Sequence, residues 1–332
     1  MTKLLIMSIL VGIASPYWGH TFIAEGNGKI YALRSLADSS SLCVFDAKVA
    51  GDAGVFCVTD EVASKALTEV TTPGKHSCHI VLLEHQAVVA DYTSGTLTLY
   101  DLDKEGMPQP NPTVVTFEGK GPHPKRQLSP HIHSSTLSPD GKTLLVADLG
   151  CDRLIRYNVV DGRLALPEAE IIAMPAGSGP RHCAFAPKGD YLYVVSELSD
   201  EVHTFRTSDY KLLHSYTLNA GNPEGGAHIV VSADGKYVYA SSRVSKTSKA
   251  PSLPVPDGVA IYKRLANGKL KELCYQPTGK HPRHFAVSAD GTKLVVACRD
   301  DDAVEVYTLE EGLPTGKVEK IEVSQPVYVR LK

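Results

Sequence analysis

The amino-acid sequence predicts an all-β fold, a seven-bladed β-propeller that forms one domain over residues 1–332. Three observations lead to this prediction: a repeated unit, a hairpin turn inside each unit, and a composition typical of β-sheets. The 15 tyrosines outnumber the phenylalanines and the single tryptophan together, and the chain holds 27 glycines and 21 prolines. No long stretch follows the 3.6-residue period of an amphipathic helix.

The repeat is clearest in two segments, Gly179–Glu197 and His281–Arg299. Both contain Pro-Arg-His, a turn of Lys-Gly or Asp-Gly, and then a second apolar strand. Asp-Gly between apolar runs is typical of a β-hairpin, because both central residues of the turn must accept a positive φ. Related copies begin at four further positions: His20, His79, His131 and Ala227. Each unit is therefore expected to be one antiparallel blade.

In chain order, the first unit is compressed into residues 20–31, and the second has Glu84-His-Gln in place of a glycine turn. The next four units share one type of turn: Ser138-Pro-Asp-Gly, Pro187-Lys-Gly, Ser232-Ala-Asp-Gly and Ser288-Ala-Asp-Gly. Histidines mark the six units at intervals of 46 to 59 residues, the length of a four-stranded blade with its connection. These histidines are His20, His79, His133, His182, His228 and His284.

Two apolar segments remain outside the six units, Leu4–Val11 and Gln325–Leu331. A propeller closes its ring by building one blade from both chain ends, because closure leaves no unpaired sheet edge. We therefore expect seven blades of four antiparallel strands, the last one closed by the N- and C-terminal strands.

Charge and cysteine content narrow the class of protein. A net charge of -3 without basic runs argues against a nucleic-acid partner. Seven cysteines without a C-x-x-C pair indicate neither a disulfide framework nor a zinc site and fit a reducing cytosol. The apolar run over residues 3–14 resembles a short signal peptide, but it is too short to span a membrane and the ring needs it as a strand. We expect a cytoplasmic monomer without a membrane partner, with secretion as the alternative.

Two sets of equivalent positions carry the candidate chemistry. The position that opens the first strand of a blade holds His133, Arg181, Ala227 and Arg283. The position that ends the second strand holds Leu149, Glu197, Arg243 and Arg299. Both ends of an antiparallel hairpin lie at the same edge, so these side chains are expected around the mouth of the central channel. The histidines one residue further on, His182, His228 and His284, are expected to point away by strand alternation.

The charged residues at these positions differ from blade to blade, which a repeat that serves only as a scaffold does not require. Guanidinium groups bind carboxylate or phosphate and stabilise an oxyanion, while a carboxylate or imidazole deprotonates water. The candidate catalytic residues are His133, Arg181, Glu197 and Arg243, and the candidate substrate-binding residues are Arg283, Arg299, His182 and His131. Glu197 is expected to be ionised beside the arginines.

Structural roles are the alternative for the same residues. The arginines and Glu197 could form salt bridges between blades, and His182, His228 and His284 could hydrogen-bond within their own blades. A metal site of His131, His133 and His182 has no supporting ligand spacing, and no metal or other cofactor is expected. The basic segment Gly119–Arg126 and the segment Val244–Gly258 are both expected on the face of the candidate site, where either could cover it.

At these residues the chain resembles the seven-bladed lactonase family, which includes propeller-type 6-phosphogluconolactonases and fungal carboxy-cis,cis-muconate cyclases. The resemblance covers about residues 75–330. It rests on Pro130-His-Ile-His133 with Ser138-Pro-Asp-Gly-Lys, Gly179-Pro-Arg-His182, Tyr193-Val-Val-Ser-Glu-Leu198, Tyr239-Ala-Ser-Ser-Arg243 and Pro282-Arg-His-Phe285. The catalytic set of the cyclase branch, one histidine, two arginines and one glutamate, falls on His133, Arg181, Arg243 and Glu197.

The resemblance implies hydrolysis of 6-phospho-glucono-1,5-lactone to 6-phosphogluconate, a step of the oxidative pentose phosphate pathway, without a cofactor. In that reaction Arg181 and Arg243 would hold the substrate and polarise its carbonyl group, and Glu197 or His133 would activate water. Arg283 and Arg299 would bind the phosphate.

Two alternatives stay open. A muconate-type cyclase would use its histidine to protonate carbon while the arginines hold carboxylates. A non-enzymatic protein-binding propeller is the other, although the chain has no repeated Trp-Asp pair and only one tryptophan, Trp18.

Overall fold

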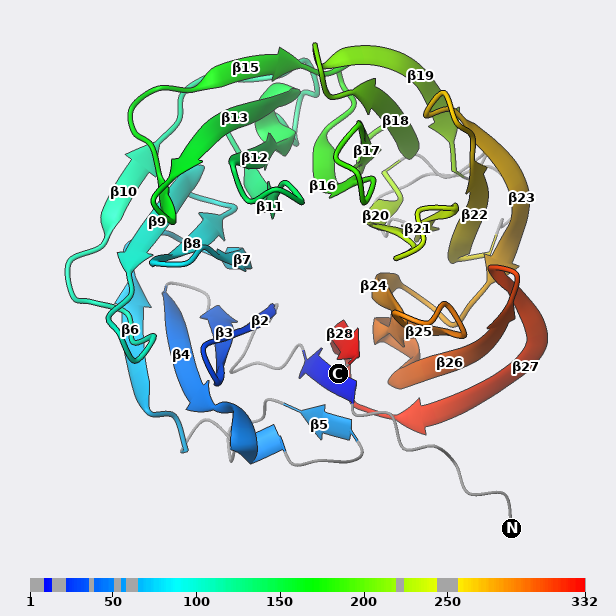
Figure 1. The fold of residues 1–332 in the computed structure, drawn as a ribbon, viewed down its shortest axis with the longest axis horizontal. Coiled ribbons are helices and arrows are strands. Elements are labelled where there is room, and N and C mark those ends of the chain that lie inside the picture. Colours follow the sequence, from blue (N-terminus) through cyan, green and yellow to red (C-terminus); the bar gives the residue numbers. More distant parts are fainter. Residues whose placement is uncertain are drawn as a thin grey trace.

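The computed structural model is a ring of seven β-sheets around a central channel (Figure 1). It describes residues 9–13, 22–35, 39–50, 55–57, 65–218, 224–243 and 256–331. The predicted seven-bladed propeller is confirmed by this sheet topology. His20, Trp18 and most of the segment Val244–Gly258 lie outside the described residues.

The first three blades follow one another along the chain. Blade 1 consists of β2 (Ile23–Gly26), β3 (Lys29–Ser35), β4 (Ser40–Asp46) and β6 (Thr68–Thr72). Blade 2 consists of β7 (Ser77–Leu82), β8 (Gln86–Asp91), β9 (Thr96–Asp101) and β10 (Thr113–Thr116). Blade 3 consists of β11 (Ile132–Leu137), β12 (Thr143–Asp148), β13 (Arg153–Val160), β15 (Glu170–Ala173) and the short β14 (Arg163–Leu164).

The next three blades each have four antiparallel strands. Blade 4 consists of β16 (Pro180–Phe185), β17 (Tyr191–Ser196), β18 (Glu201–Arg206) and β19 (Lys211–Thr217). Blade 5 consists of β20 (Gly226–Val231), β21 (Tyr237–Ser242), β22 (Gly258–Arg264) and β23 (Leu270–Pro277). Blade 6 consists of β24 (Pro282–Val287), β25 (Lys293–Cys298), β26 (Ala303–Glu310) and β27 (Leu313–Glu322).

Blade 7 is built from both ends of the chain, as expected. The C-terminal strand β28 (Pro326–Leu331) pairs antiparallel with the N-terminal strand β1 (Ile9–Ile13). Outside β1 lies β5 (Val55–Cys57), which comes from the connection within blade 1 and runs parallel to β1. The described part of this blade therefore has three strands and one parallel pair, whereas the sequence predicted four antiparallel strands.

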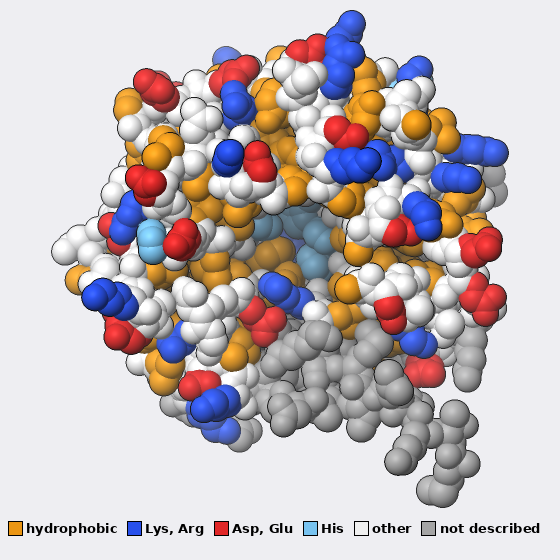
Figure 2. All heavy atoms as spheres, in the orientation of Figure 1, with side chains coloured by type: hydrophobic (Ala, Val, Ile, Leu, Met, Phe, Trp, Pro, Cys, Tyr) orange, Lys and Arg blue, Asp and Glu red, His pale blue; other side chains and the backbone are white. Residues whose placement is uncertain are grey.

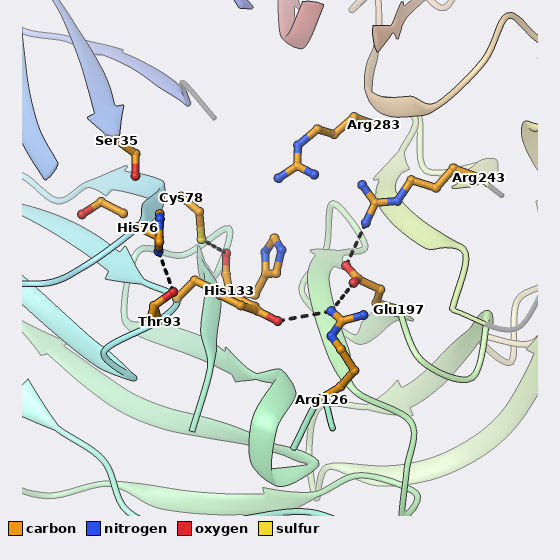
Figure 3. A pocket seen from close by; sticks show the side chains of 11 residues that line it. Ser35, His76, Cys78, Thr93, Arg126, His133, Glu197, Arg243 and Arg283 are labelled. Carbon is orange, nitrogen blue, oxygen red and sulfur yellow. Dashed lines mark hydrogen bonds and ion pairs between the residues drawn. The ribbon is translucent and has the colours of Figure 1, made fainter. Parts of the chain in front are cut away.

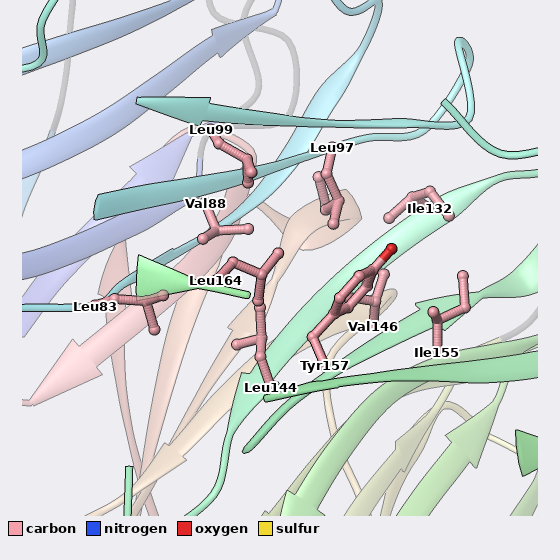
Figure 4. Close-up of a cluster of buried hydrophobic side chains, with 11 residues drawn as sticks. Leu83, Val88, Leu97, Leu99, Ile132, Leu144, Val146, Ile155, Tyr157 and Leu164 are labelled. Atoms are coloured by element: carbon pink, nitrogen blue, oxygen red, sulfur yellow. The ribbon is translucent and has the colours of Figure 1, made fainter. Parts of the chain in front are cut away.

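Apolar side chains fill the spaces between neighbouring blades. Between blades 2 and 3, the core contains Val88, Leu97, Ile132, Leu144 and Tyr157 (Figure 4). The second and third strands of the blades are buried almost throughout, because both of their faces are covered by adjacent blades.

Several buried tyrosines connect adjacent blades by hydrogen bonds, which accounts for part of the high tyrosine content. The hydroxyl of Tyr193 on β17 donates to the carbonyl of Gly268, 3.0 Å away in blade 5. The hydroxyl of Tyr239 on β21 donates to the carbonyl of Gly312, 2.9 Å away in blade 6. A phenol suits this position because its ring fills the core while its hydroxyl satisfies a turn carbonyl.

Three short 3-10 helices complete the described secondary structure: η1 (Ala47–Ala50), η2 (Leu149–Cys151) and η3 (Arg299–Asp301). Among the described residues, no helix has the length and the apolar character that are needed to cross a bilayer.

Candidate active site

A cavity of about 310 Å³ lies at the end of the channel where the innermost strands begin and the second strands end. Eleven residues line it: Ser35, His76, Ser77, Cys78, Tyr92, Thr93, Arg126, His133, Glu197, Arg243 and Arg283 (Figure 3). Four of the predicted site residues, His133, Glu197, Arg243 and Arg283, are thus brought together from blades 3, 4, 5 and 6. This arrangement agrees with the expectation that the candidate site residues gather at the mouth of the channel.

Local β-bulges place the side chains that open each innermost strand. The pairing of β16 with β17 shifts register between Pro180 and His182, so that Arg181 is an extra residue in its strand. The same shift occurs around His133 in β11 and around Arg283 in β24. Because a bulge interrupts the two-residue alternation, both the bulged residue and its neighbour can face the channel.

Glu197 is the centre of the charged cluster. Its Oε2 accepts hydrogen bonds from Nε of Arg181 and from Nη2 of Arg243, each at 2.9 Å. Its Oε1 accepts from Nη2 of Arg126 at 2.6 Å. Both carboxylate oxygens are therefore occupied, and the ion pairs hold three arginines in fixed positions.

These ion pairs also determine the protonation state of Glu197. Burial by itself would raise the pKa of Glu197, but Arg243, Arg181 and Arg126 hold it well below its usual value. Burial, together with the nearby Arg243, lowers the pKa of Arg181 to about 10, which still leaves this guanidinium charged at neutral pH. Glu197 is accordingly an ionised carboxylate, as expected from the sequence.

Arg181 itself lies behind the cavity and does not line it. Its side chain is only 2% exposed, and its Nη1 donates to the main-chain carbonyl of Ala227 in blade 5. A group so enclosed can orient Glu197, and it borders a smaller hollow next to the cavity together with Cys78, His133 and Arg283.

His133 lies in the middle of the cavity, between Cys78 and the arginines (Figure 3). Burial and the charge of Arg181 lower its pKa well below the usual value, so the imidazole is neutral at physiological pH. Its Nδ1 has no hydrogen-bond partner among the described residues. A neutral imidazole can accept a proton from water.

Residues 28–331 match the profile of the family described as lactonase, seven-bladed β-propeller. The chain belongs to this lactonase family. The family resemblance inferred from the sequence is thereby confirmed.

Two named relatives and one solved structure support this family assignment. A 6-phosphogluconolactonase of Formosa agariphila is 31% identical over 242 residues, which cover 70% of this chain and 65% of that protein. A 6-phosphogluconolactonase of Bacillus subtilis is 27% identical over 77% of this chain and 73% of its own length. The crystal structure of a Bacteroides fragilis protein, provisionally assigned as a 6-phosphogluconolactonase, superimposes with a TM-score of 0.79 at 29% identity, over 96% of this chain and 88% of that one.

Arg126 and Tyr92 also line the cavity. From the sequence, Arg126 was expected near the site only as the end of a basic segment, and Tyr92 was not expected there. Nη2 of Arg126 lies 3.2 Å from the hydroxyl of Tyr92 as well as 2.6 Å from Glu197. Arg126 comes from the connection between blades 2 and 3, which is fixed by the buried amide of Gln127, a donor to the carbonyl of Leu149 at 2.8 Å. The basic segment that ends at Arg126 therefore does reach the site.

A signal for Tyr92 was present in the repeat. Strand β8 ends in Ala-Asp91, and strand β12 ends in Ala-Asp148. The residues that follow, Tyr92 and Leu149, are equivalent to Glu197, so aligning these two strand ends would have found Tyr92. Arg126 has no such signal, because it lies outside the repeated unit.

Three predicted substrate-binding residues do not line the cavity. His131 stacks on the ring of Tyr92, with ring centroids 4.6 Å apart, and its Nδ1 lies 3.0 Å from the carbonyl of Tyr92. Arg299 lies in η3, where its Nε donates to Asp300 at 2.7 Å. His182 lies below the cavity, within hydrogen-bond distance of Arg181.

His182 belongs to a second layer of side chains, deeper in the channel, which we call the histidine layer. Its members are Phe22, His79, His182, His228, His284 and Tyr328. Figure 2 shows histidine side chains at the bottom of the central hollow. The expected alternation, which would have turned these histidines away, was wrong, because the bulges let consecutive residues face the channel.

These histidines pair between blades, whereas the structural alternative expected hydrogen bonds within each blade. Nδ1 of His182 lies 2.7 Å from Nδ1 of His228 in the next blade, and Nδ1 of His284 accepts from the main-chain N–H of Val329 in blade 7 at 3.4 Å. Within the described residues, no cluster of three or more histidine, cysteine or acidic side chains is arranged to hold a metal ion.

Proposed function

We propose that the protein hydrolyses a sugar lactone, 6-phospho-glucono-1,5-lactone, to 6-phosphogluconate. The observation that carries this proposal is a cavity in which a neutral imidazole, His133, lies beside cavity-facing guanidinium groups. Lactone hydrolysis needs these two elements, a base for water and cations for the oxyanion that forms on the carbonyl oxygen. The names of the relatives support the choice of substrate.

In this reaction the carbonyl oxygen would lie against Arg243 and Arg126. Both guanidinium groups line the cavity, and both are held in place by Glu197. Fixed donors stabilise a developing oxyanion without having to reorganise during the reaction. Arg181, which does not reach the cavity, acts as a positioning residue for Glu197.

The base is His133. The oxygen of water forms a bond to the carbonyl carbon, and its proton passes to the imidazole. The carbonyl carbon then releases the ring oxygen, which takes up a proton to become a hydroxyl group, and the product is the open-chain acid. Glu197 is less suited to this role, because both of its oxygens are bound by arginines.

A covalent route through the cysteine of the cavity is disfavoured. Burial raises the pKa of the Cys78 thiol to about 12, and its sulfur donates toward the carbonyl of His133 at 3.4 Å. The thiol is therefore protonated at neutral pH, whereas the nucleophilic form is the thiolate.

The test is acid release from freshly prepared 6-phospho-glucono-1,5-lactone, followed in a pH-stat. We expect His133→Ala to lower kcat by about a hundredfold or more, because it removes the base. We expect a similar loss for Glu197→Gln, which releases the arginines from their fixed positions. Replacement of the exposed His85 by alanine serves as the control. Wild-type turnover in both site variants would contradict the proposal.

The same assay with a carboxymuconolactone separates the proposal from a muconate-type cyclase, since only that enzyme would convert the second lactone. We further propose that the chain acts as one cytoplasmic domain and as a monomer, on a small anionic lactone, with neither nucleic acid nor membrane as a partner.

A further inference from the structure

The hydroxyl group of Tyr92 is a proton donor in the cavity wall whose hydrogen has no acceptor among the described residues. Tyr92 lines the cavity, and Nη2 of Arg126 donates to its phenol oxygen at 3.2 Å. A guanidinium group has N–H donors and no acceptor, so it cannot receive the hydrogen of the phenol. That hydrogen is therefore left for a molecule bound in the cavity.

The other hydroxyl groups that line the cavity are paired with neighbouring side chains. Oγ of Ser77 donates to a buried carboxylate, and Oγ1 of Thr93 lies 2.7 Å from Nδ1 of His76 (Figure 3). Oγ of Ser35 lies 3.3 Å from Oγ of Ser40. Among the described hydroxyl groups of the wall, the phenol thus differs from the rest, because its partner is a donor and a cation.

The ring of Tyr92 is held in place by two histidines. His131 stacks on it, with ring centroids 4.6 Å apart and an angle of 13° between the ring planes. His133 meets the ring nearly at a right angle, with centroids 5.5 Å apart. These contacts position the hydroxyl group without using its hydrogen. A fixed position suits a group that has to meet a reacting atom, because orientation then costs nothing during the reaction.

The hydroxyl group also lies where the proposed reaction needs a proton. In that reaction the carbonyl oxygen of the lactone would lie against Arg243 and Arg126, and Arg126 is the residue that contacts the phenol. The ring oxygen of a lactone is bonded to the same carbon as the carbonyl oxygen. A lactone whose carbonyl oxygen contacts Arg126 therefore has its ring oxygen within reach of Tyr92.

We propose that Tyr92 is the general acid that protonates the ring oxygen of the lactone as its bond to the carbonyl carbon breaks. This inference rests on the proposed lactonase function and assigns the proton donor that the reaction needs. Without a donor, the ring oxygen would have to leave as an alkoxide, which is a much stronger base than a phenolate. Transfer of the phenol proton removes this obstacle.

The electrostatics of the site suit a proton that is given up only during the reaction. Burial and the charge of Glu197 raise the pKa of Tyr92, so the phenol is protonated at neutral pH. When the carbon–oxygen bond breaks, its electron pair goes to the ring oxygen, which takes the proton of Tyr92. The charge of Arg126 stabilises the phenolate that remains, and the proton that His133 took from water returns to it through solvent.

The test replaces Tyr92 with phenylalanine, which keeps the ring between the two histidines and removes the hydroxyl group. We expect Tyr92→Phe to lower kcat for 6-phospho-glucono-1,5-lactone by about a hundredfold and to change KM by less than about threefold, because the lost interaction belongs to the transition state. Tyr191→Phe is the matched control and should leave kcat unchanged. The hydroxyl of Tyr191 donates to the carbonyl of Ala266 at 3.4 Å, at the opposite end of β17 from Glu197. The melting temperature of each variant shows whether it is folded.

A second substrate separates proton donation from an indirect effect through Arg126. It is the thiolactone of the same phosphorylated sugar, in which sulfur replaces the ring oxygen. A thiolate is a weak base and leaves without a proton. Tyr92→Phe should therefore hydrolyse the thiolactone with a kcat within about threefold of wild type. Equal losses with both substrates would show that the hydroxyl group only positions Arg126, and they would overturn the inference.

The outcomes distinguish this inference from the proposed function. If wild type hydrolyses the lactone and Tyr92→Phe retains its kcat, His133 or solvent supplies the proton. The inference is then overturned while the lactonase function stands. If wild type hydrolyses neither substrate, the proposed function fails and the inference fails with it.

Discussion

Two layers of side chains fill the channel of this propeller, and consecutive residues of the same strands supply both. Arg181 and Arg283 reach the outer, charged layer, while His182 and His284 reach the histidine layer below it. The outer layer borders a cavity and keeps its charges through ion pairs. The histidine layer has no acidic partner among the described residues, and its imidazoles are neutral because burial lowers the pKa of each.

Burial lowers the pKa of His133 and of the deeper histidines alike, so the two layers differ in what their side chains border. His133 lines the cavity, whereas the deeper histidines pack ring against ring below it. The rings of His228 and His284 are stacked, with centroids 3.8 Å apart. We infer that the histidine layer forms the floor of the cavity and connects neighbouring blades.

The largest effect that tests this comparison should appear on acidification. Five buried histidines of the channel, His79, His133, His182, His228 and His284, have lowered pKa values, that of His79 about 3. Burial also lowers the pKa of His203 and His281 outside the histidine layer, and both add to the same effect. Their unfolded-state pKa is about 6.5, so between pH 6.5 and 5 the unfolded chain binds protons that the folded chain does not. The free energy of unfolding should therefore fall by several kcal/mol as the pH drops from 7 to 5.

The carboxylate of the outer layer should respond only at lower pH. The pKa of Glu197 is lowered in the folded state, so the stability it contributes persists above its unfolded value of about 4.5 and is lost below it. Urea unfolding at several pH values measures both effects. A free energy of unfolding that stays constant from pH 7 to 5 would show that the histidine layer is not neutral and buried as described.

A smaller effect on the free energy of unfolding is expected when Arg181, the most buried arginine of the charged layer, is replaced. Arg181→Met should lower the free energy of unfolding at pH 7.5 by about 3–5 kcal/mol, because Glu197 keeps its burial but loses one of its partners. Arg126→Met removes a half-exposed partner of the same carboxylate and should cost about 1 kcal/mol. Equal losses in the two variants would contradict the view that Arg181 supports the site from behind.

The smallest effect should follow a change within the histidine layer. His228→Phe keeps the ring stacking and loses one hydrogen bond to His182, so at pH 7.5 it should cost about 1 kcal/mol. It should also reduce the dependence of stability on pH by as much as 1.4 kcal/mol per pH unit below pH 6.5, because one titrating group is gone. An unchanged pH dependence would indicate that His228 does not contribute to it.

Much of the site could be predicted from the sequence because the repeat imposes the same geometry on every blade. Aligning the copies was enough to place His133, Glu197, Arg243 and Arg283 at one end of the channel. The same argument misplaced the histidines, because a β-bulge leaves no mark in the pattern of apolar residues. It also missed Arg126, since a connection between blades has no counterpart elsewhere in the repeat.

The sequence by itself determined the number of blades, the closure by both chain ends and the family, because repeated hairpins carry these features in local patterns. Only the tertiary structure decided which of the described arginines around the site pair with Glu197 and which do not. That distinction depends on how far each guanidinium lies from Glu197 across several blades, and no spacing along the chain encodes such a distance. Arg283 and Arg299 occupy different positions of one blade, yet only Arg283 faces the cavity.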